Sequence, residues 1–106
     1  MRLLKKVIII SNKRYGLNYE RKEKHFLISQ GYTANRNRGS FGGFDLVACN
    51  KQHFLLENIK STKQKYYSYV QELEFVKNFE NAPQGTIKRF VLYQRGERKV
   101  LYEGIV

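Results

Sequence analysis

A lone aspartate inside an apolar, strand-forming segment constrains the fold of this chain more than any other feature. Asp45 is the only aspartate in the sequence, and it lies within Phe44-Asp45-Leu46-Val47-Ala48. Burying an unpaired carboxylate among apolar residues is costly unless a cationic group compensates its charge. The fold must therefore bring such a group close to Asp45.

The following predicted strand, residues 53–60, supplies candidate neighbours. The two-residue period of a strand places Asn58 and Lys60 on one face and Glu57 on the other. If the two strands form a hairpin, Asp45, Asn58 and Lys60 converge at one edge of the sheet. Carboxylate and amide oxygens suit Mg²⁺, and an adjacent lysine can orient an attacking water or stabilise charge on a phosphate.

The rest of the pattern predicts a mixed sheet flanked by helices. In chain order we expect a helix over 19–30 closed by Gly31, strands over 32–38, 44–49 and 53–60, a helix over 64–79, and a hairpin of strands 87–94 and 99–106. The short apolar run 7–10 could add a strand, but it cannot form a signal-peptide core or a membrane span. At 106 residues the chain is one domain with a single core.

The charge of the chain favours a polyanionic partner. Twenty Lys and Arg residues against nine acidic residues give a net charge of +11, and nucleic acid is the commonest polyanion. A solvated basic surface kept for solubility is the alternative. Cys49, the only cysteine, cannot form an internal disulfide, which favours an intracellular compartment of a cell or virus-infected cell. Its apolar neighbours predict a buried thiol.

Five short motifs follow one another between residues 16 and 61. They are Gly16-Leu17-Asn18-Tyr19-Glu20-Arg21, Gly31-Tyr32, Arg36-Asn37-Arg38-Gly39-Ser40, Phe44-Asp45-Leu46-Val47-Ala48 and Ile59-Lys60-Ser61. In this order they resemble the motifs of archaeal-type Holliday junction resolvases, which belong to the nuclease superfamily named for its Pro-Asp…Asp/Glu-x-Lys signature. The resemblance implies an α/β, restriction-endonuclease-like fold in a single nuclease domain. Within residues 1–106, residues 1–15 would be a basic N-terminal segment and 16–65 the catalytic motif region.

The resemblance also assigns roles to individual residues. It implies catalytic roles for Glu20, Asp45, Asn58, Lys60 and Ser40, of which Glu20, Asp45 and Asn58 would bind the metal ion. Mg²⁺ is the expected cofactor, and Mn²⁺ could substitute for it. The residues expected to bind DNA are Arg14, Arg21, Arg36, Arg38 and Lys63.

This sequence departs from the family pattern at two positions. Phe44 replaces the proline of the signature, which is common in this branch of the superfamily. Asn58 replaces a glutamate, so it keeps a carbonyl oxygen for the metal but loses a negative charge, which should weaken metal binding. Glu57 could take its place only if a bulge turned its side chain around.

Plainer explanations exist for several of these residues. Glu20 could simply favour the first turn of a helix through its dipole, and Lys60 could be solvated surface. Arg36 and Arg38 could protect an exposed sheet edge as well as bind phosphate. The tyrosines 66, 67 and 69 could stack on unpaired bases, although packing in the core or a dimer interface is the more frequent use.

The resemblance implies a structure-specific endonuclease that resolves four-way (Holliday) junctions by metal-dependent phosphodiester hydrolysis. Branched double-stranded DNA would be the partner, with no membrane association. A homodimer is expected because a junction needs two symmetric cuts. Two alternatives remain open: a nuclease of the same fold acting on other branched or damaged DNA, or a junction-binding protein weakened in catalysis by Asn58.

Overall fold

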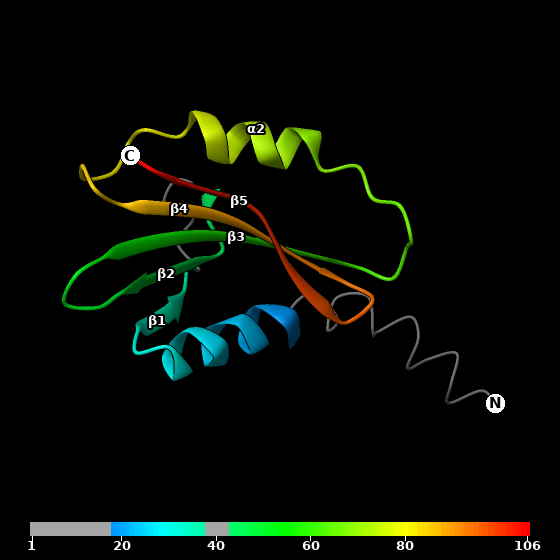
Figure 1. Cartoon of the computed structure of the whole chain (residues 1–106), viewed down its shortest axis with the longest axis horizontal. Coiled ribbons are helices and arrows are strands. Elements are labelled where there is room, and N and C mark those ends of the chain that lie inside the picture. Colours follow the sequence, from blue (N-terminus) through cyan, green and yellow to red (C-terminus); the bar gives the residue numbers. More distant parts are fainter. Residues whose placement is uncertain (1–17, 38–42) are drawn as a thin grey trace.

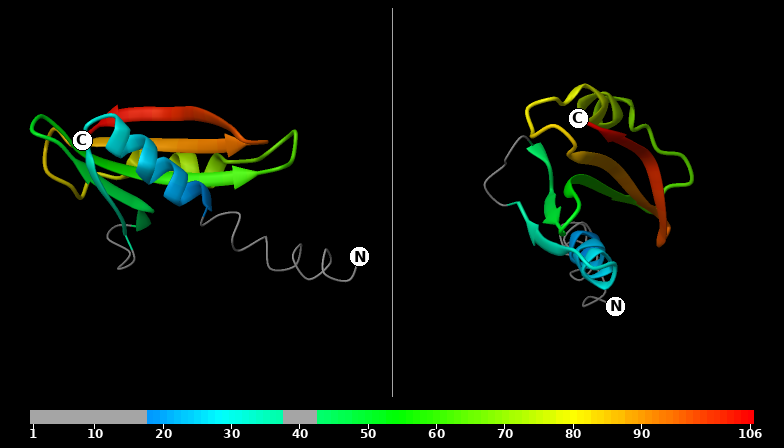
Figure 2. Two further views of the ribbon diagram at one scale, coloured as in Figure 1. Left: turned by 90° about the horizontal axis from the view of Figure 1, so that it is seen from below. Right: turned by 60° about the vertical axis from the view of Figure 1, so that its left-hand side comes forward.

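A five-stranded sheet lies between two helices in the computed structural model of the chain (Figures 1 and 2). The structure describes residues 18–37 and 43–106. The helix over residues 18–29 covers one face of the sheet, and α2 (Val70–Asn78) covers the other. The predicted α/β arrangement, a mixed sheet flanked by helices, is confirmed. The strand considered for residues 7–10 lies outside the described residues.

The strands occupy the sheet in the order of the sequence. They are β1 (Thr33–Arg36), β2 (Leu46–Cys49), β3 (Phe54–Thr62), β4 (Ile87–Gln94) and β5 (Glu97–Ile105). β3 and β4 are parallel, so α2 serves as the crossover between them, and the other neighbours are antiparallel. β2 and β3 are thus hairpin neighbours, as the argument about Asp45 required.

The starts of three elements differ from the predicted ones by two residues or more. β2 begins at Leu46 because Asp45 uses its side chain in the ladder, as described below. α2 begins at Val70, six residues late, because the Gln94 side chain binds the carbonyls of Gln64 and Lys65 and holds this segment outside the helix. β5 begins at Glu97 because the hairpin turn contains only Arg95 and Gly96, both with positive φ.

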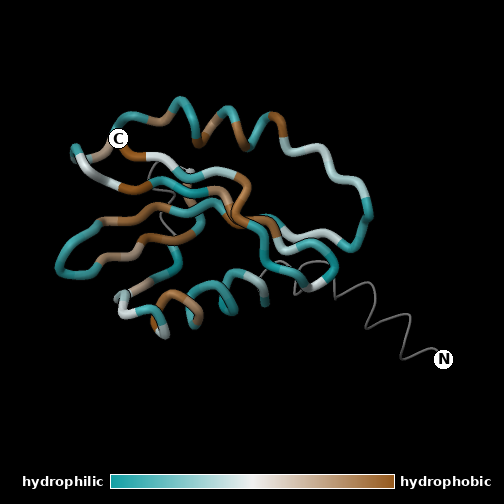
Figure 3. The backbone as a smooth tube through the Cα atoms, viewed as in Figure 1, coloured by the Kyte–Doolittle hydropathy of each residue, from teal (hydrophilic) through white to brown (hydrophobic). Residues whose placement is uncertain are grey.

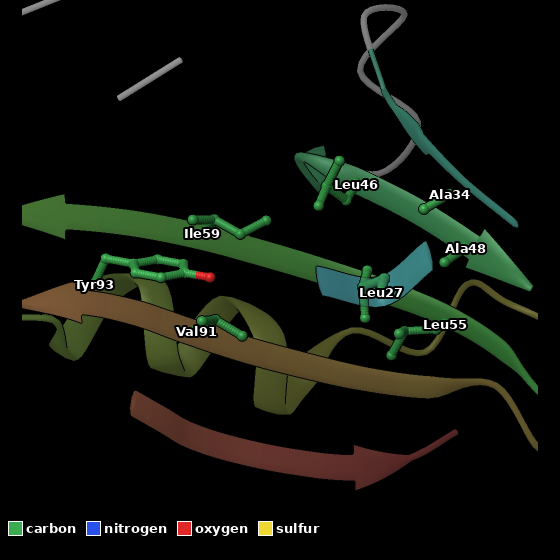
Figure 4. Close-up of a cluster of buried hydrophobic side chains, with 8 residues drawn as sticks. All are labelled: Leu27, Ala34, Leu46, Ala48, Leu55, Ile59, Val91 and Tyr93. Carbon is green, nitrogen blue, oxygen red and sulfur yellow. The ribbon is translucent and has the colours of Figure 1, made fainter. Parts of the chain in front are cut away.

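Each face of the sheet has its own apolar cluster. Under the helix over 18–29, the buried residues are Leu27, Ala34, Leu46, Ala48, Leu55, Ile59, Val91 and Tyr93 (Figure 4). Under α2, Phe44, Leu56, Val76 and Phe90 are buried. Apolar residues accordingly recur along the strands, whereas the β4–β5 turn is polar (Figure 3).

The ends of the elements explain two further details. Gly31 ends the first helix with a φ of 94°, as predicted, and the Tyr32 N–H reaches back to the Leu27 carbonyl. The prediction of a buried Cys49 is wrong: it is the last residue of β2, beyond the half-buried Val47 on the same face, and it is exposed. None of the helices in the described ranges combines the length and apolar character needed to cross a bilayer.

Candidate active site

Asp45 lies where β2 separates from β3. The Asp45 N–H donates to the Glu57 carbonyl (2.9 Å), and the Asp45 carbonyl accepts from the Asn37 N–H (2.9 Å). Its Oδ2 accepts the Ile59 N–H at 2.8 Å. The carboxylate therefore replaces a strand carbonyl at the point where the β2–β3 ladder ends, which fixes its position relative to β3.

Charged side chains from three elements lie close enough to Asp45 to influence the pKa of its carboxyl group. Burial raises the pKa of its carboxyl group, and the nearby Glu20 carboxylate adds to this effect; the Ile59 N–H, Lys60 and Arg36 oppose it, but the pKa stays above its ordinary value. The helix contributes Glu20, β1 contributes Arg36 and β3 contributes Lys60. The structure thus brings together three of the predicted catalytic residues.

Arg36 connects β1 to the first helix. Its Nε donates to Glu20 Oε1 at 3.3 Å, and both side chains are only about a quarter exposed or less. β1 is an edge strand, as the protection argument supposed, but Arg36 pairs with an acid of the site. An incoming phosphate or metal ion would therefore compete with this ion pair.

Asn58 lies two residues before Lys60, and the strand period places both on the same face of β3. It is 7% exposed. Glu57 faces the opposite side of the sheet, where it is completely buried and paired with Arg89. No bulge in β3 therefore brings Glu57 to the side of Asn58. A neutral amide stands where the motif has a carboxylate.

The donors around Asp45 fit a hard divalent ion, although the set is sparse. Among residues 18–37 and 43–106, no group of three or more His, Cys, Asp or Glu residues could hold a metal ion. Glu20 and Asp45 supply two carboxylates whose mutual repulsion contributes to the raised pKa of Asp45, and a cation would relieve it. Mg²⁺ is commonly bound through one or two carboxylates and several waters, so the chemistry of these two carboxylates fits such an ion.

The other predicted residues are spread around this site. Arg21 is exposed on the first helix, and Lys63 is exposed directly after β3. Arg14, Arg38 and Ser40 lie outside the described residues.

A buried network of charges beside the site was not predicted. Glu23, one helical turn after Glu20, is completely buried. It accepts hydrogen bonds from Arg98 Nε and NH2 (2.8 and 2.9 Å) and from the Tyr93 hydroxyl (2.7 Å). Arg89 NH1 donates to Glu57 at 2.6 Å and its guanidinium also contacts Glu103.

The two buried carboxyl groups of this network have opposite pKa shifts. Burial and the adjacent Glu23 together raise the pKa of Glu57 to about 9, and Arg89 only partly opposes this rise. Burial also acts to raise the pKa of Glu23, but hydrogen bonds from Arg98, Glu57 and Tyr93 outweigh it and lower the pKa. Glu57 Oε1 is buried and accepts no hydrogen bond from a donor in the described part of the chain. A proton on Glu57, donated to Glu23, satisfies both groups.

Two signals in the sequence pointed to this network. Glu57 interrupts the apolar run Phe54-Leu55-Leu56, and Glu23 shares a helix face with Leu27. Their basic partners come from β4 and β5, more than thirty residues away in sequence, so only the sheet topology identifies them.

Comparisons with known proteins show which family and fold the chain resembles. The model of the family described as archaeal Holliday junction resolvase (Hjc) matches residues 11–100. Among solved structures, the 1.6 Å structure of Hjc from Archaeoglobus fulgidus, a Holliday junction resolvase of an archaeal hyperthermophile, is similar with a TM-score of 0.62. The identity is 26%, and the match covers 78% of this chain and 72% of that one. The curated proteins contain no match to the sequence.

Proposed function

Because the chain belongs to the archaeal Holliday junction resolvase family, we propose that it cuts four-way DNA junctions by metal-dependent hydrolysis at the Asp45 site. The observation that carries this proposal is the environment of the partly desolvated Asp45 carboxylate. Glu20 of the first helix and Lys60 of β3 both influence its pKa. Such a site offers anionic oxygens to a cation and a lysine to a phosphate.

Each residue would have a distinct task. Asp45 and Glu20 would hold a divalent ion, preferably Mg²⁺, with the Asn58 carbonyl as a neutral third donor. When bound, the ion would lower the pKa of a coordinated water and neutralise charge on the scissile phosphate. The Ile59 N–H keeps Asp45 in place, so its second oxygen can serve the ion without reorganisation.

The basic residues would handle the DNA. Lys60 would donate to a phosphate oxygen on which charge develops, and Arg36 would exchange its bond to Glu20 for a bidentate contact with phosphate. Arg21 and Lys63, both exposed, would bind the backbone farther out. For Arg14, Arg38 and Ser40 we retain the roles implied by the family resemblance.

We further propose that a single nuclease domain acts as a homodimer inside the cell. Resolution requires one cut in each of two strands, and a two-fold dimer places two sites symmetrically on a junction. The net charge of +11 would favour recognition of the shape and backbone of branched DNA, since phosphate contacts carry no base sequence.

The test is cleavage of a labelled four-way junction beside a flap and a linear duplex of the same sequence, with Mg²⁺, Mn²⁺ or chelator. We expect paired, metal-dependent nicks in the junction, abolished in Asp45→Asn but retained in Glu80→Gln, a matched change at an exposed carboxylate. Equal cutting of all three substrates, or cutting in chelator, would refute the proposal.

A second candidate rests on Asn58, which leaves this position without a carboxylate. The protein would then bind junctions tightly but cut them slowly. Asn58→Glu should in that case raise the cleavage rate strongly with little change in junction affinity. No gain in rate would exclude this candidate.

A further inference from the structure

A basic surface separate from the candidate active site lies at the β4–β5 hairpin turn, near the start of the helix that carries Glu20. A cavity of about 290 Å³, which we call the hairpin cleft, is lined by Lys65, Gln94, Arg95, Glu97 and Lys99. The hairpin turn lies close to the start of the helix, because a Cβ atom added to Gly96 would lie 3.8 Å from the Tyr19 hydroxyl. One end of the molecule thus holds this turn, the end of β3 and the start of the helix (Figures 1 and 2).

Gln94 organises the cleft with both ends of its amide. Its Nε2 donates to the carbonyls of Gln64 (3.1 Å) and Lys65 (2.7 Å), and its Oε1 accepts from Lys99 Nζ (3.0 Å). The Arg95 N–H donates to the Thr62 carbonyl at 2.8 Å. The segment after β3 and the hairpin turn are therefore fixed to one another, together with the lysines and the arginine that they carry.

The charges gathered in this way are unbalanced. Three basic side chains line the hairpin cleft and only Glu97 opposes them, whereas Gln94, which holds them together, is neutral. Like charges brought together on a fixed frame repel one another, and an anionic ligand would remove that cost. A rigid, basic cleft thus favours an anion with several charges.

The position of the cleft identifies the anion. β3 carries Lys60 of the candidate active site and ends at Thr62, about 7 Å farther at the usual rise per residue, and Lys63 and Lys65 follow. We propose that the hairpin cleft binds backbone phosphates of the DNA arm next to the cut strand, with Lys65, Arg95 and Lys99 as contacts and Gln94 as the positioning residue. This inference rests on the proposed function and extends the DNA interface to the far end of β4.

The test is a double variant that removes charge and leaves the turn intact. Arg95 has a φ of 53°, which asparagine tolerates, and Asn-Gly is a preferred sequence for such two-residue turns. Lys65→Gln with Arg95→Asn therefore removes two charges without straining the hairpin. The control is Lys51→Gln with Lys77→Gln, which removes two charges from exposed positions at the β2–β3 turn and on α2.

Junction binding is measured in chelator, where no cutting occurs, over a range of salt concentrations. Each lost phosphate contact lowers the slope of log K against log salt by about 0.9. Between about 50 and 200 mM salt, the affinity of the original protein should therefore fall about tenfold more than that of the double variant. The control should keep the original slope, and Gln94→Ala should weaken binding without any change in charge.

Single-turnover cleavage at saturating protein separates this inference from the proposed function. We expect the original protein and the control, Lys51→Gln with Lys77→Gln, to cut the junction at the same rate. If the double variant has the slope of the control, or if Gln94→Ala binds as the original protein does, the inference is wrong while the nuclease proposal stands. If the original protein cuts no DNA but shows the expected slopes, the proposed function fails and the cleft remains a phosphate site.

Discussion

The Glu23–Glu57 pair leads to a sharp prediction, because the same substitution should destabilise the fold much more at one of these adjacent buried glutamates than at the other. Glu23 is ionised and accepts bonds from Arg98 and Tyr93, whereas Glu57 is protonated at neutral pH. Glutamine mimics a protonated carboxyl group in shape and can donate to Glu23. Glu57→Gln should therefore cost about 1 kcal/mol or less, the scale of one hydrogen bond.

Glu23→Gln, in contrast, leaves Arg98 without its anion. Breaking a buried ion pair from one side costs about 3–5 kcal/mol, and the lower end applies because a quarter of the Arg98 side chain is exposed. The melting temperature should fall by at least about 12 °C, since each kcal/mol shifts it by about 4–8 °C in a domain near this size. Urea unfolding of both variants at pH 7 gives the two free energies.

The pH dependence gives an independent check on Glu57. Its pKa rises on folding from the ordinary 4.5 to about 9, so between these values the folded protein keeps a proton that the unfolded chain releases. Stability should then fall as the pH rises through this window, by at most about 1.4 kcal/mol per pH unit, and Glu57→Gln should lack this loss. Parallel stability curves of the two proteins from pH 6 to 8, or equal costs of Glu57→Gln and Glu23→Gln, would refute the shared proton.

Three further predictions concern the active site and the fold. In metal-free protein, the NMR titration of the Asp45 carboxyl carbon should give a pKa above the ordinary value of 3.8. Glu20→Gln should lower this pKa because it removes a like charge. An unchanged pKa would show that Glu20 and Asp45 do not interact. Asn58→Glu should lower the Mg²⁺ concentration needed for half-maximal cleavage, whereas Asn58→Ala should raise it, and identical metal titrations would place Asn58 outside the metal site. Gly31→Ala should cost about 1 kcal/mol in urea unfolding, because its φ of 94° strains any side chain although the space is open, and no loss would contradict this account of the helix end.

The sequence predicted the parts of the fold that depend on local pattern. Gly31 as a helix end, the strand 87–94 and the opposite faces of Glu57 and Lys60 all follow from backbone preference or strand period, and all three are confirmed. The start of α2 at Val70 could not be predicted, because a glutamine thirty residues later holds the preceding segment.

The candidate site also contains features that the sequence predicted and features that it did not. Asp45 and Lys60 stood out because a lone acid in an apolar strand needs a nearby cation, and the structure brings them together. The pairing of Arg36 with Glu20 was not anticipated, since it depends on how the first helix lies across β1. The roles of these residues in metal and DNA binding remain predictions for the experiments above.

The hydrogen bond that Arg89 donates to Glu57 also distinguishes the two sides of β3. A slip of this strand by one residue would exchange its two faces, so Glu57 would turn toward the side where Asn58 and Lys60 now lie, and Asn58 would enter the charged network. That arrangement would leave Arg89 facing an amide and place Lys60 on the wrong side of the sheet. Arg89, whose side chain is only 14% exposed, thus penalises the alternative register and keeps Asn58 and Lys60 on the side of the sheet opposite to Glu57.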